Sequence, residues 1–526
     1  MESDFGKIRS LFWPIRRHEL SRFVPMMLLF FLIAFNYHIL KILKDTLIIT
    51  APQSGAETIP FLKVWAILPS AILLTFLFTK LSSKLNRENI FYVVMSVFLG
   101  FFALFIFVIY PNIELFNLNS TADMLATKLP LGFKGFISII RYWHFSLFYI
   151  MAESWSTIML SLLLWIFIVD VLSIDQAKRY YAFFGVSRNS AGILCGFLGQ
   201  YLAAKSLSSN ASVHFLSKFC GAKTPWDQTL LIFIVTALVC GVCIMTLYRY
   251  LHVYKYPKRY LLGGDINKKG KQNISFVKSI LYTVKSKYVL YISLLVLCYN
   301  ILINLVEVLW KSQIKELYPG SSAFTAFTSK VTLITGVVAV ISSFFISGNL
   351  IRRLGWRVTA LVTPIALIVS AFGFFYFVFV KKFAENSNVA ITLFGLSPLV
   401  LAVLFGAVQD IFSRSLKYTV FDDTKEMAFI PLSAEEKLQS KSAIDGIGSR
   451  LGKSGSSLIM QILFMIFITP MGASPIIFGI VILIFPIWII AINRLSKQFE
   501  EKTKLLPKPE REASEAHENI EETPST

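Results

Sequence analysis

Two lysines lie inside or beside long apolar segments of the chain. Lys63 follows the apolar residues 59–62, and Lys453 stands shortly before an apolar run that begins at Leu458. A charge at the centre of a bilayer costs roughly 3 kcal/mol on insertion scales, so a charged side chain in a membrane-spanning segment usually has a function. Two such lysines favour an anionic ligand. The alternative for Lys63 is an interfacial anchor beside Trp65.

Two glutamates occupy similar places. Glu153 lies between the largely aromatic and apolar residues 143–151 and a long apolar run, and Glu307 lies four residues before Lys311. A glutamate side chain is short and escapes to the membrane surface less readily than lysine, which favours a functional role for Glu153. The alternative for Glu307 is a helix-stabilising pair with Lys311, one turn further along.

Further candidates share these segments. In the first apolar segment Tyr37, Lys41 and Lys44 fall at positions i, i+4 and i+7, which is one face of a helix. Either the two lysines face a ligand, or they extend to the membrane surface. Arg188 is a candidate because its span, the fifth, corresponds to the span of Lys453 in the second half. The secondary candidates are Asn36, Tyr37, Asn300 and Lys311.

Lys453 lies in a segment rich in glycine and serine, residues 446–457. This segment is not a phosphate loop of the Walker type, because that motif requires glycine at position 447, where the chain has Ile447. The small residues would let helices pack closely, but packing does not explain the lysine. The sequence has no His, Cys and Asp cluster typical of a metal site and no Ser–His–Asp grouping. It therefore predicts neither a cofactor nor an enzyme.

The composition is typical of a membrane protein. Of the 526 residues, 55% are hydrophobic, 16% are charged and 48 are Phe, and the mean hydropathy is +0.64. Soluble chains of this length add domains rather than apolar surface. The net charge of +20 lies mostly in predicted loops, where it indicates membrane topology rather than binding to nucleic acid. We therefore predict an all-α polytopic membrane protein.

Apolar segments of about 20 residues, the length that crosses a bilayer, occur twelve times. Lys and Arg gather in alternate loops: the loop after the second span has Lys80, Lys84 and Arg87, whereas residues 50–58 have neither type. The positive-inside rule then places both termini in the cytoplasm. The predicted spans are residues 23–48, 61–79, 89–110, 144–170, 182–204, 228–248, 288–312, 324–347, 358–380, 391–413, 443–468 and 473–493.

A basic stretch at residues 249–287 separates six spans from six. This is the layout of major-facilitator-like transporters, in which two six-helix bundles enclose a substrate cavity. We expect a cytoplasmic N-terminus (1–22), an N-terminal six-helix bundle (23–248), a basic cytoplasmic linker (249–287), a C-terminal six-helix bundle (288–494) and a disordered cytoplasmic tail (495–526).

Three groups of residues carry a family resemblance. The first reads Asp-Thr-Leu-Ile-Ile-Thr-Ala-Pro from Asp45 and Ile-Pro-Phe-Leu-Lys-Val-Trp from Ile59. The second reads Lys-Glu-Met-Ala-Phe-Ile-Pro-Leu from Lys425, and the third reads Leu-Gly-Lys-Ser-Gly from Leu451. With them the chain resembles the ADP/ATP carrier (nucleotide transporter) family of plastids and of obligate intracellular bacteria such as chlamydiae and rickettsiae. The resemblance covers nearly the whole chain except its two ends.

The resemblance implies a nucleotide transporter that imports host ATP in exchange for ADP by alternating access. The functionally important charged residues of the family match Lys63, Glu153, Glu307 and Lys453. The expected location is the inner membrane of a bacterium, with nucleotides as substrates, the lipid bilayer as surroundings and no nucleic-acid partner. We expect a monomer.

Two departures from the family pattern leave an alternative open. The exchangers usually have Arg-Asp-Thr where this chain has Lys41-Ile42-Leu43, and Glu-Leu-Trp-Gly where it has Glu-Ser-Trp-Ser from Glu153. The alternative is import of ATP, GTP, CTP and UTP, by exchange or with protons. In either case Lys63, Lys453, Lys41 and Arg188 are expected to bind phosphate. Glu153 and Glu307 are expected to act in coupling or gating, by holding the lysines in the empty site or by taking up a proton.

Overall fold

The computed structural model describes residues 15–172, 174–204, 224–255, 285–345, 349–389, 391–393, 395–441, 444 and 449–504. Within these ranges the chain is helical apart from short connections and one bridge between Leu393 and Leu396. Ten helical segments are long and apolar enough to cross a membrane. Together with α11 (Ile174–Ala204) and α21 (Ser449–Phe467), they correspond one to one to the twelve predicted spans. The predicted fold class, an all-α polytopic membrane protein, is confirmed.

The first half of the chain has its own hydrophobic core, in which Phe148, Trp155 and Phe184 are almost fully buried. Its last span begins with a capping box between Thr224 and Asp227, followed by proline at the first helical position. The spans are α2 (Leu20–Ile49); α3 (Thr58–Leu62), η2 (Lys63–Ile67) and α4 (Leu68–Lys84); α5 (Arg87–Leu104); α9 (Trp143–Trp155), η6 (Ser156–Leu163) and α10 (Leu164–Val171); α11; and α13 (Pro225–Tyr250).

The second half has a separate core that includes Trp310, Phe374 and Trp488. Gly355 has a positive φ of 74°, which glycine adopts readily, and it divides α17 into two parts. The helices are α15 (Lys287–Leu317); α16 (Ser321–Phe345); α17 (Asn349–Ser387); α18 (Pro398–Leu416), η11 (Lys417–Phe421) and α19 (Asp422–Ala428); α20 (Ala434–Lys441); α21; and α22 (Pro470–Lys504).

The predicted disordered tail begins too early. Helix α22 continues to Lys504, so residues 495–504 are helical. The reason is packing: Leu495 is fully buried, and the ring of Phe499 stacks on Trp356 with centroids 5.5 Å apart. The start of the predicted linker is also helical, since η8 extends α13 to residue 255. Three stretches of the predicted terminal and linker regions lie outside the described residues. They are residues 1–14 of the N-terminus, 256–284 of the linker and 505–526 of the tail.

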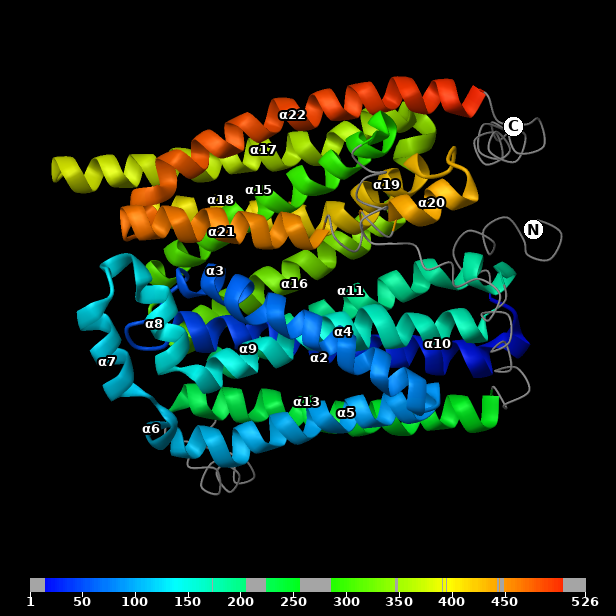
Figure 1. Cartoon of the computed structure of the whole chain (residues 1–526), viewed down its shortest axis with the longest axis horizontal. Coiled ribbons are helices and arrows are strands. Elements are labelled where there is room, and N and C mark those ends of the chain that lie inside the picture. Colours follow the sequence, from blue (N-terminus) through cyan, green and yellow to red (C-terminus); the bar gives the residue numbers. More distant parts are fainter. Residues whose placement is uncertain are drawn as a thin grey trace.

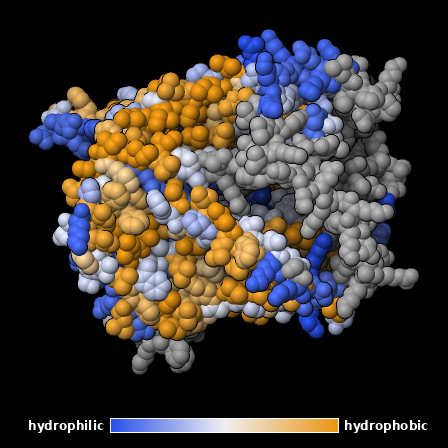
Figure 2. Space-filling model, in the orientation of Figure 1, coloured by the Kyte–Doolittle hydropathy of each residue, from blue (hydrophilic) through white to orange (hydrophobic). Residues whose placement is uncertain are grey.

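The two halves lie side by side along the long axis of the molecule (Figure 1). They meet along two seams, one between α11 and α16 and one between α3 with η2 and α21. The first seam depends on glycine, since a Cβ on Gly196 would lie only 2.5 Å from the backbone nitrogen of Leu333. The visible face carries a broad hydrophobic band with hydrophilic residues towards both ends (Figure 2), as expected for a protein that crosses a bilayer.

Three short helices cover the end of the molecule at which α2 finishes, which we call the closed end; the opposite end, where α2 begins and α22 finishes, is the open end (Figure 1). These helices are too short to cross a bilayer. Arg141 of the third donates to the carboxylate of Asp123 in the second at 2.5 Å, which ties the two together. They are α6 (Ile113–Phe116), α7 (Asn119–Lys128) and α8 (Lys134–Arg141).

Candidate functional site

A cavity of about 600 Å³ lies between the two halves. It extends from Asp45 of α2 and Lys311 of α15, at its deep end, to α19. The described surface is hollowed between the halves towards the open end (Figure 2). With all groups ionised, its lining carries a net charge of +3. The basic residues of the lining are Lys41, Lys44, Lys63, Lys311, Arg414, Lys417, Lys425 and Lys453, and the acidic ones are Asp45, Glu153, Glu307, Asp422 and Glu426.

Most of the predicted site residues meet in this cavity. Its lining includes Lys41, Lys63, Lys453, Glu153, Glu307, Tyr37, Asn300 and Lys311. Asn36 instead faces the core of the first half, where its amide donates to the carbonyl of Ala237 at 3.0 Å. Arg188, on α11, is not among the lining residues. The functional roles assigned to all ten residues stay predictions.

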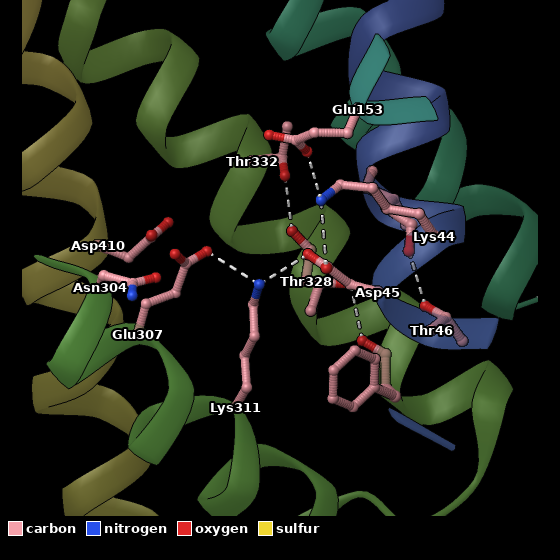
Figure 3. A network of polar contacts seen from close by, with 12 residues as sticks. Lys44, Asp45, Thr46, Glu153, Asn304, Glu307, Lys311, Thr328, Thr332 and Asp410 are labelled. Atoms are coloured by element: carbon pink, nitrogen blue, oxygen red, sulfur yellow. Dashed lines mark hydrogen bonds and ion pairs between the residues drawn. The ribbon is translucent and has the colours of Figure 1, made fainter. Parts of the chain in front are cut away.

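A continuous chain of ion pairs crosses the deep end of the cavity (Figure 3). The Nζ atom of Lys44 lies 2.9 Å from Glu153 and 3.7 Å from Asp45. Asp45 in turn lies 2.9 Å from Lys311, which lies 2.9 Å from Glu307. Because Asp45 belongs to α2 and Lys311 to α15, their ion pair connects the two halves.

Glu307 is shared between two cations. Besides its pair with Lys311 on the same helix, its carboxylate lies 3.3 Å from the guanidinium of Arg414 on α18. Arg414 is held by Asp410, one turn earlier on α18, at 2.8 Å. The helix pair weighed as the alternative for Glu307 is thus present, but the carboxylate also joins α15 to α18.

Lys63 and Lys453 have different surroundings from Lys44 and Lys311, the lysines of the ion-pair network. Lys63 Nζ donates to the side-chain oxygen of Asn304, on α15 of the other half. It faces the cavity rather than the membrane surface, so the structure does not favour the anchor role beside Trp65. Lys453 is exposed in the cavity. Within the described part of the chain, no carboxylate lies within ion-pair distance of Lys41, Lys63 or Lys453.

Asn304 contacts both of these lysines, the side chain of Lys63 and the main chain of Lys453. Its oxygen accepts from Lys63, and its amide nitrogen lies 2.7 Å from the hydroxyl of Ser456 and 3.2 Å from the carbonyl of Lys453. The sequence analysis missed this residue. A signal was present, since Asn300, Asn304, Glu307 and Lys311 follow a spacing of four, three and four residues and so share one face of α15.

Three cavity-lining segments are π-helical. The segment η2 begins at Lys63, η6 begins three residues after Glu153, and η11 begins at Lys417. Such segments change the direction in which a helix presents its side chains, and they occur frequently at functional sites. Local sequence patterns that predict helices do not distinguish them from ordinary α-helix.

The closed end is sealed by hydrogen bonds between the halves. They join Thr46 to Thr325 (3.1 Å), Thr50 to Ser321 (2.7 Å) and Lys315 to the carbonyl of Ser54. Gln461 of α21 also donates to the carbonyl of Pro60 at 2.8 Å. The cavity is therefore reached from the open end.

Comparisons with known proteins identify the family of this chain. The family described as TLC ATP/ADP transporter matches residues 1–499. The chain is 40% identical to ADP,ATP carrier protein 1 of Chlamydia muridarum, covering 99% of this chain and 98% of that one. It is 36% identical to ADP,ATP carrier protein 1 of Rickettsia typhi, covering 95% and 97%.

Among solved structures, the xylose transporter XylE from E. coli, in a partially occluded inward-open conformation, matches 93% of this chain and 99% of that chain. The TM-score is 0.48 and the sequence identity is 12%. The family resemblance predicted from the sequence is confirmed by the family match and by the relatives. This chain is a multi-pass membrane protein that belongs to the TLC ATP/ADP transporter family, a family of transporters rather than enzymes.

Proposed function

We propose that this protein exchanges ATP for ADP across the inner membrane of a bacterium by alternating access, and so imports ATP. The observation that carries the proposal is a net-positive cavity in which lysines from both halves, Lys41, Lys63 and Lys453, have no carboxylate partner among the described residues. A nucleoside triphosphate carries about four negative charges and cannot enter lipid without such partners. The cavity of about 600 Å³ is also in the usual size range of small-molecule sites.

In this proposal the phosphate groups bind first to the lysines that need no rearrangement. Lys63 belongs to the first half and Lys453 to the second, so one polyphosphate attracts both halves. This attraction would draw the open end together around the substrate. Lys41 lies on the same wall as Lys44 and would add a third cation. The phosphate-binding role predicted for Arg188, which does not line the cavity, stays a prediction.

The ion pair between Asp45 and Lys311 supplies a reason for exchange. When the closed end opens, these two residues must separate, because they belong to different halves. Separating a buried pair without a replacement partner costs about 3–5 kcal/mol. A bound nucleotide can replace the carboxylate beside Lys311, whereas an empty site cannot. The empty protein would then change conformation slowly, and uptake of one nucleotide would require release of another.

The orientation follows from the distribution of basic residues. The positive-inside rule places both termini in the cytoplasm, and the open end is the one where α2 begins and α22 finishes. The described conformation is therefore open to the cytoplasm in this proposal. In this proposal the protein acts as a monomer.

Proteoliposomes test the proposal. Vesicles that contain the purified protein are either loaded with ADP or left empty, and labelled ATP is added outside. Exchange predicts uptake into loaded vesicles only. It also predicts a response to membrane potential of roughly 2.3 kcal/mol per 100 mV, because ATP and ADP differ by about one charge.

The same vesicles separate exchange from the alternative mode. Strong uptake into empty vesicles that a protonophore abolishes would replace exchange by proton symport. Competition by unlabelled ATP, GTP, CTP and UTP measures selectivity. The motive is that residues 41–43, 154 and 156 differ from the family pattern. Equal competition by all four triphosphates would favour the broad-specificity alternative.

A further inference from the structure

Lys330 lies on an apolar, exposed face of α16. The exposed residues of this helix in the described range are Ala323, Lys330, Ile334 and Ile341, which are seven, four and seven residues apart. These spacings place all four on one face of the helix. The two isoleucines are 36% and 52% exposed. Lys330 is therefore the one charged residue of an otherwise apolar stripe.

This stripe faces away from the centre of the protein. No residue of α16 lines the central cavity. The remaining faces of the helix are occupied: Ser329 is in close contact with Gly199 of α11, and Thr325 bonds to Thr46 of α2. Helix α18 also packs against α16. The face that carries Lys330 is thus the one directed to the lipid.

Lys330 lies deep in the membrane-spanning part of α16. The helix has 25 residues, and at 1.5 Å per residue Lys330 is about 14 Å from its start and about 5 Å from its midpoint. The hydrocarbon core of a bilayer is about 30 Å thick. At that depth an isolated ammonium group is strongly disfavoured, and a lysine there extends towards the membrane surface or acquires an anionic partner.

The protein does not supply that partner. Within the described residues, Lys330 makes no hydrogen bond or ion pair. A second copy of the chain has no suitable carboxylate to offer, because the carboxylates deep in the described spans belong to the central site. These are Asp45, Glu153, Glu307 and Asp410, which line the cavity or pair with its residues.

We propose that Lys330 extends along α16 towards the closed end, the direction in which side chains of this helix tilt, and binds the phosphate of an anionic phospholipid held beside the seam between α11 and α16. The neighbouring residue, Ser329, contacts Gly196 and Gly199 of the other half. A lipid anchored on Lys330 therefore borders both halves and stabilises their contact. This site lies on the outside of the protein and is independent of the nucleotide cavity.

Lipid-dependent thermal stability tests the proposal. The purified protein in detergent is mixed with phosphatidylglycerol or with phosphatidylcholine of the same acyl chains, and its melting temperature is measured. We expect phosphatidylglycerol to raise the melting temperature by several degrees more than phosphatidylcholine does. Lys330→Leu should remove this difference, and Lys330→Arg should keep it. Leucine suits a lipid-facing position, so loss of folding is not expected.

A matched control separates this site from a general charge effect. Lys128→Leu removes an exposed lysine from α7, outside the predicted spans, and should leave the phosphatidylglycerol effect unchanged. An undiminished effect in Lys330→Leu, or an equal effect of both lipids on the unmodified protein, would overturn the proposal. So would an equal shift caused by inorganic phosphate, or a finding that the unmodified protein is a dimer and Lys330→Leu a monomer.

Discussion

The lysines of the central cavity fall into two groups with opposite surroundings. Lys44 and Lys311 have only 10% and 7% of their side chains exposed, and each lies within 4 Å of two carboxylates. Lys63 and Lys453 have no such partner in the described part of the structure. In the proposed function, a paired lysine must exchange its carboxylate for a phosphate, whereas an unpaired one binds phosphate directly. The proposal therefore assigns conformational coupling to Lys44 and Lys311 and substrate binding to Lys63 and Lys453.

Asp45→Asn should have the largest effect, because it removes the carboxylate that both paired lysines share. We expect the free energy of unfolding of the empty protein to fall by about 3–5 kcal/mol, the usual loss when one member of a buried ion pair is removed. Thermal unfolding in detergent measures this. Adding Lys311→Met should restore part of the loss, and a strictly additive double-mutant cycle would show that the pair does not couple the halves.

Lys63→Ala and Lys453→Ala should each reduce nucleotide affinity by about 10- to 100-fold, since one charge-assisted hydrogen bond contributes about 1.5–3 kcal/mol. Uptake at low nucleotide concentration should approach background while membrane insertion is unchanged. Initial rates over a concentration series measure the effect. Lys84→Ala, which removes an exposed lysine at the end of α4, is the control. Normal transport by both cavity variants would eliminate phosphate binding by the unpaired lysines.

Glu307→Gln should affect turnover more than affinity. A carboxylate does not contact phosphate favourably, but this one holds Lys311 and Arg414. We expect the maximal rate to fall about tenfold, or about 1.4 kcal/mol in barrier height, with a much smaller change in the dissociation constant. A binding titration combined with saturation kinetics distinguishes the two. A large loss of affinity at an unchanged maximal rate would place Glu307 with the substrate-binding group instead.

Gly196→Ala should have the smallest effect, and it tests the contact between the halves without altering any charge. A methyl group there would meet backbone atoms of Ser329 and Leu333 at 2.5 Å. We expect a loss of stability of about 1 kcal/mol, at the low end for over-packed sites. Gly185→Ala on the same helix is the matched control, because nothing lies within 4 Å of the added carbon. Equal stability of the two variants would contradict the close seam.

The sequence predicts the spans and part of the site for a common physical reason. Bilayer thickness fixes the length of a span, and the cost of a buried charge marks Lys63, Glu153, Glu307 and Lys453. Asn304 is neutral and gives no such signal. Which carboxylate meets which lysine depends on how α2 and α15 face each other across the cavity, and a single sequence does not contain that information. Mean hydropathy also does not reveal π-helical segments or the short helices α6 to α8.

The division between the two groups of lysines is tested most directly by titrating the purified protein with ATP and AMP, which differ only in their phosphates. The unmodified protein should bind ATP more tightly than AMP, because ATP offers more charge to Lys63 and Lys453. In Lys453→Ala the ratio of the two dissociation constants should shrink by about tenfold or more, corresponding to about 1.4 kcal/mol. An unchanged ratio, with both nucleotides weakened equally or not at all, would contradict direct phosphate binding by the unpaired lysine.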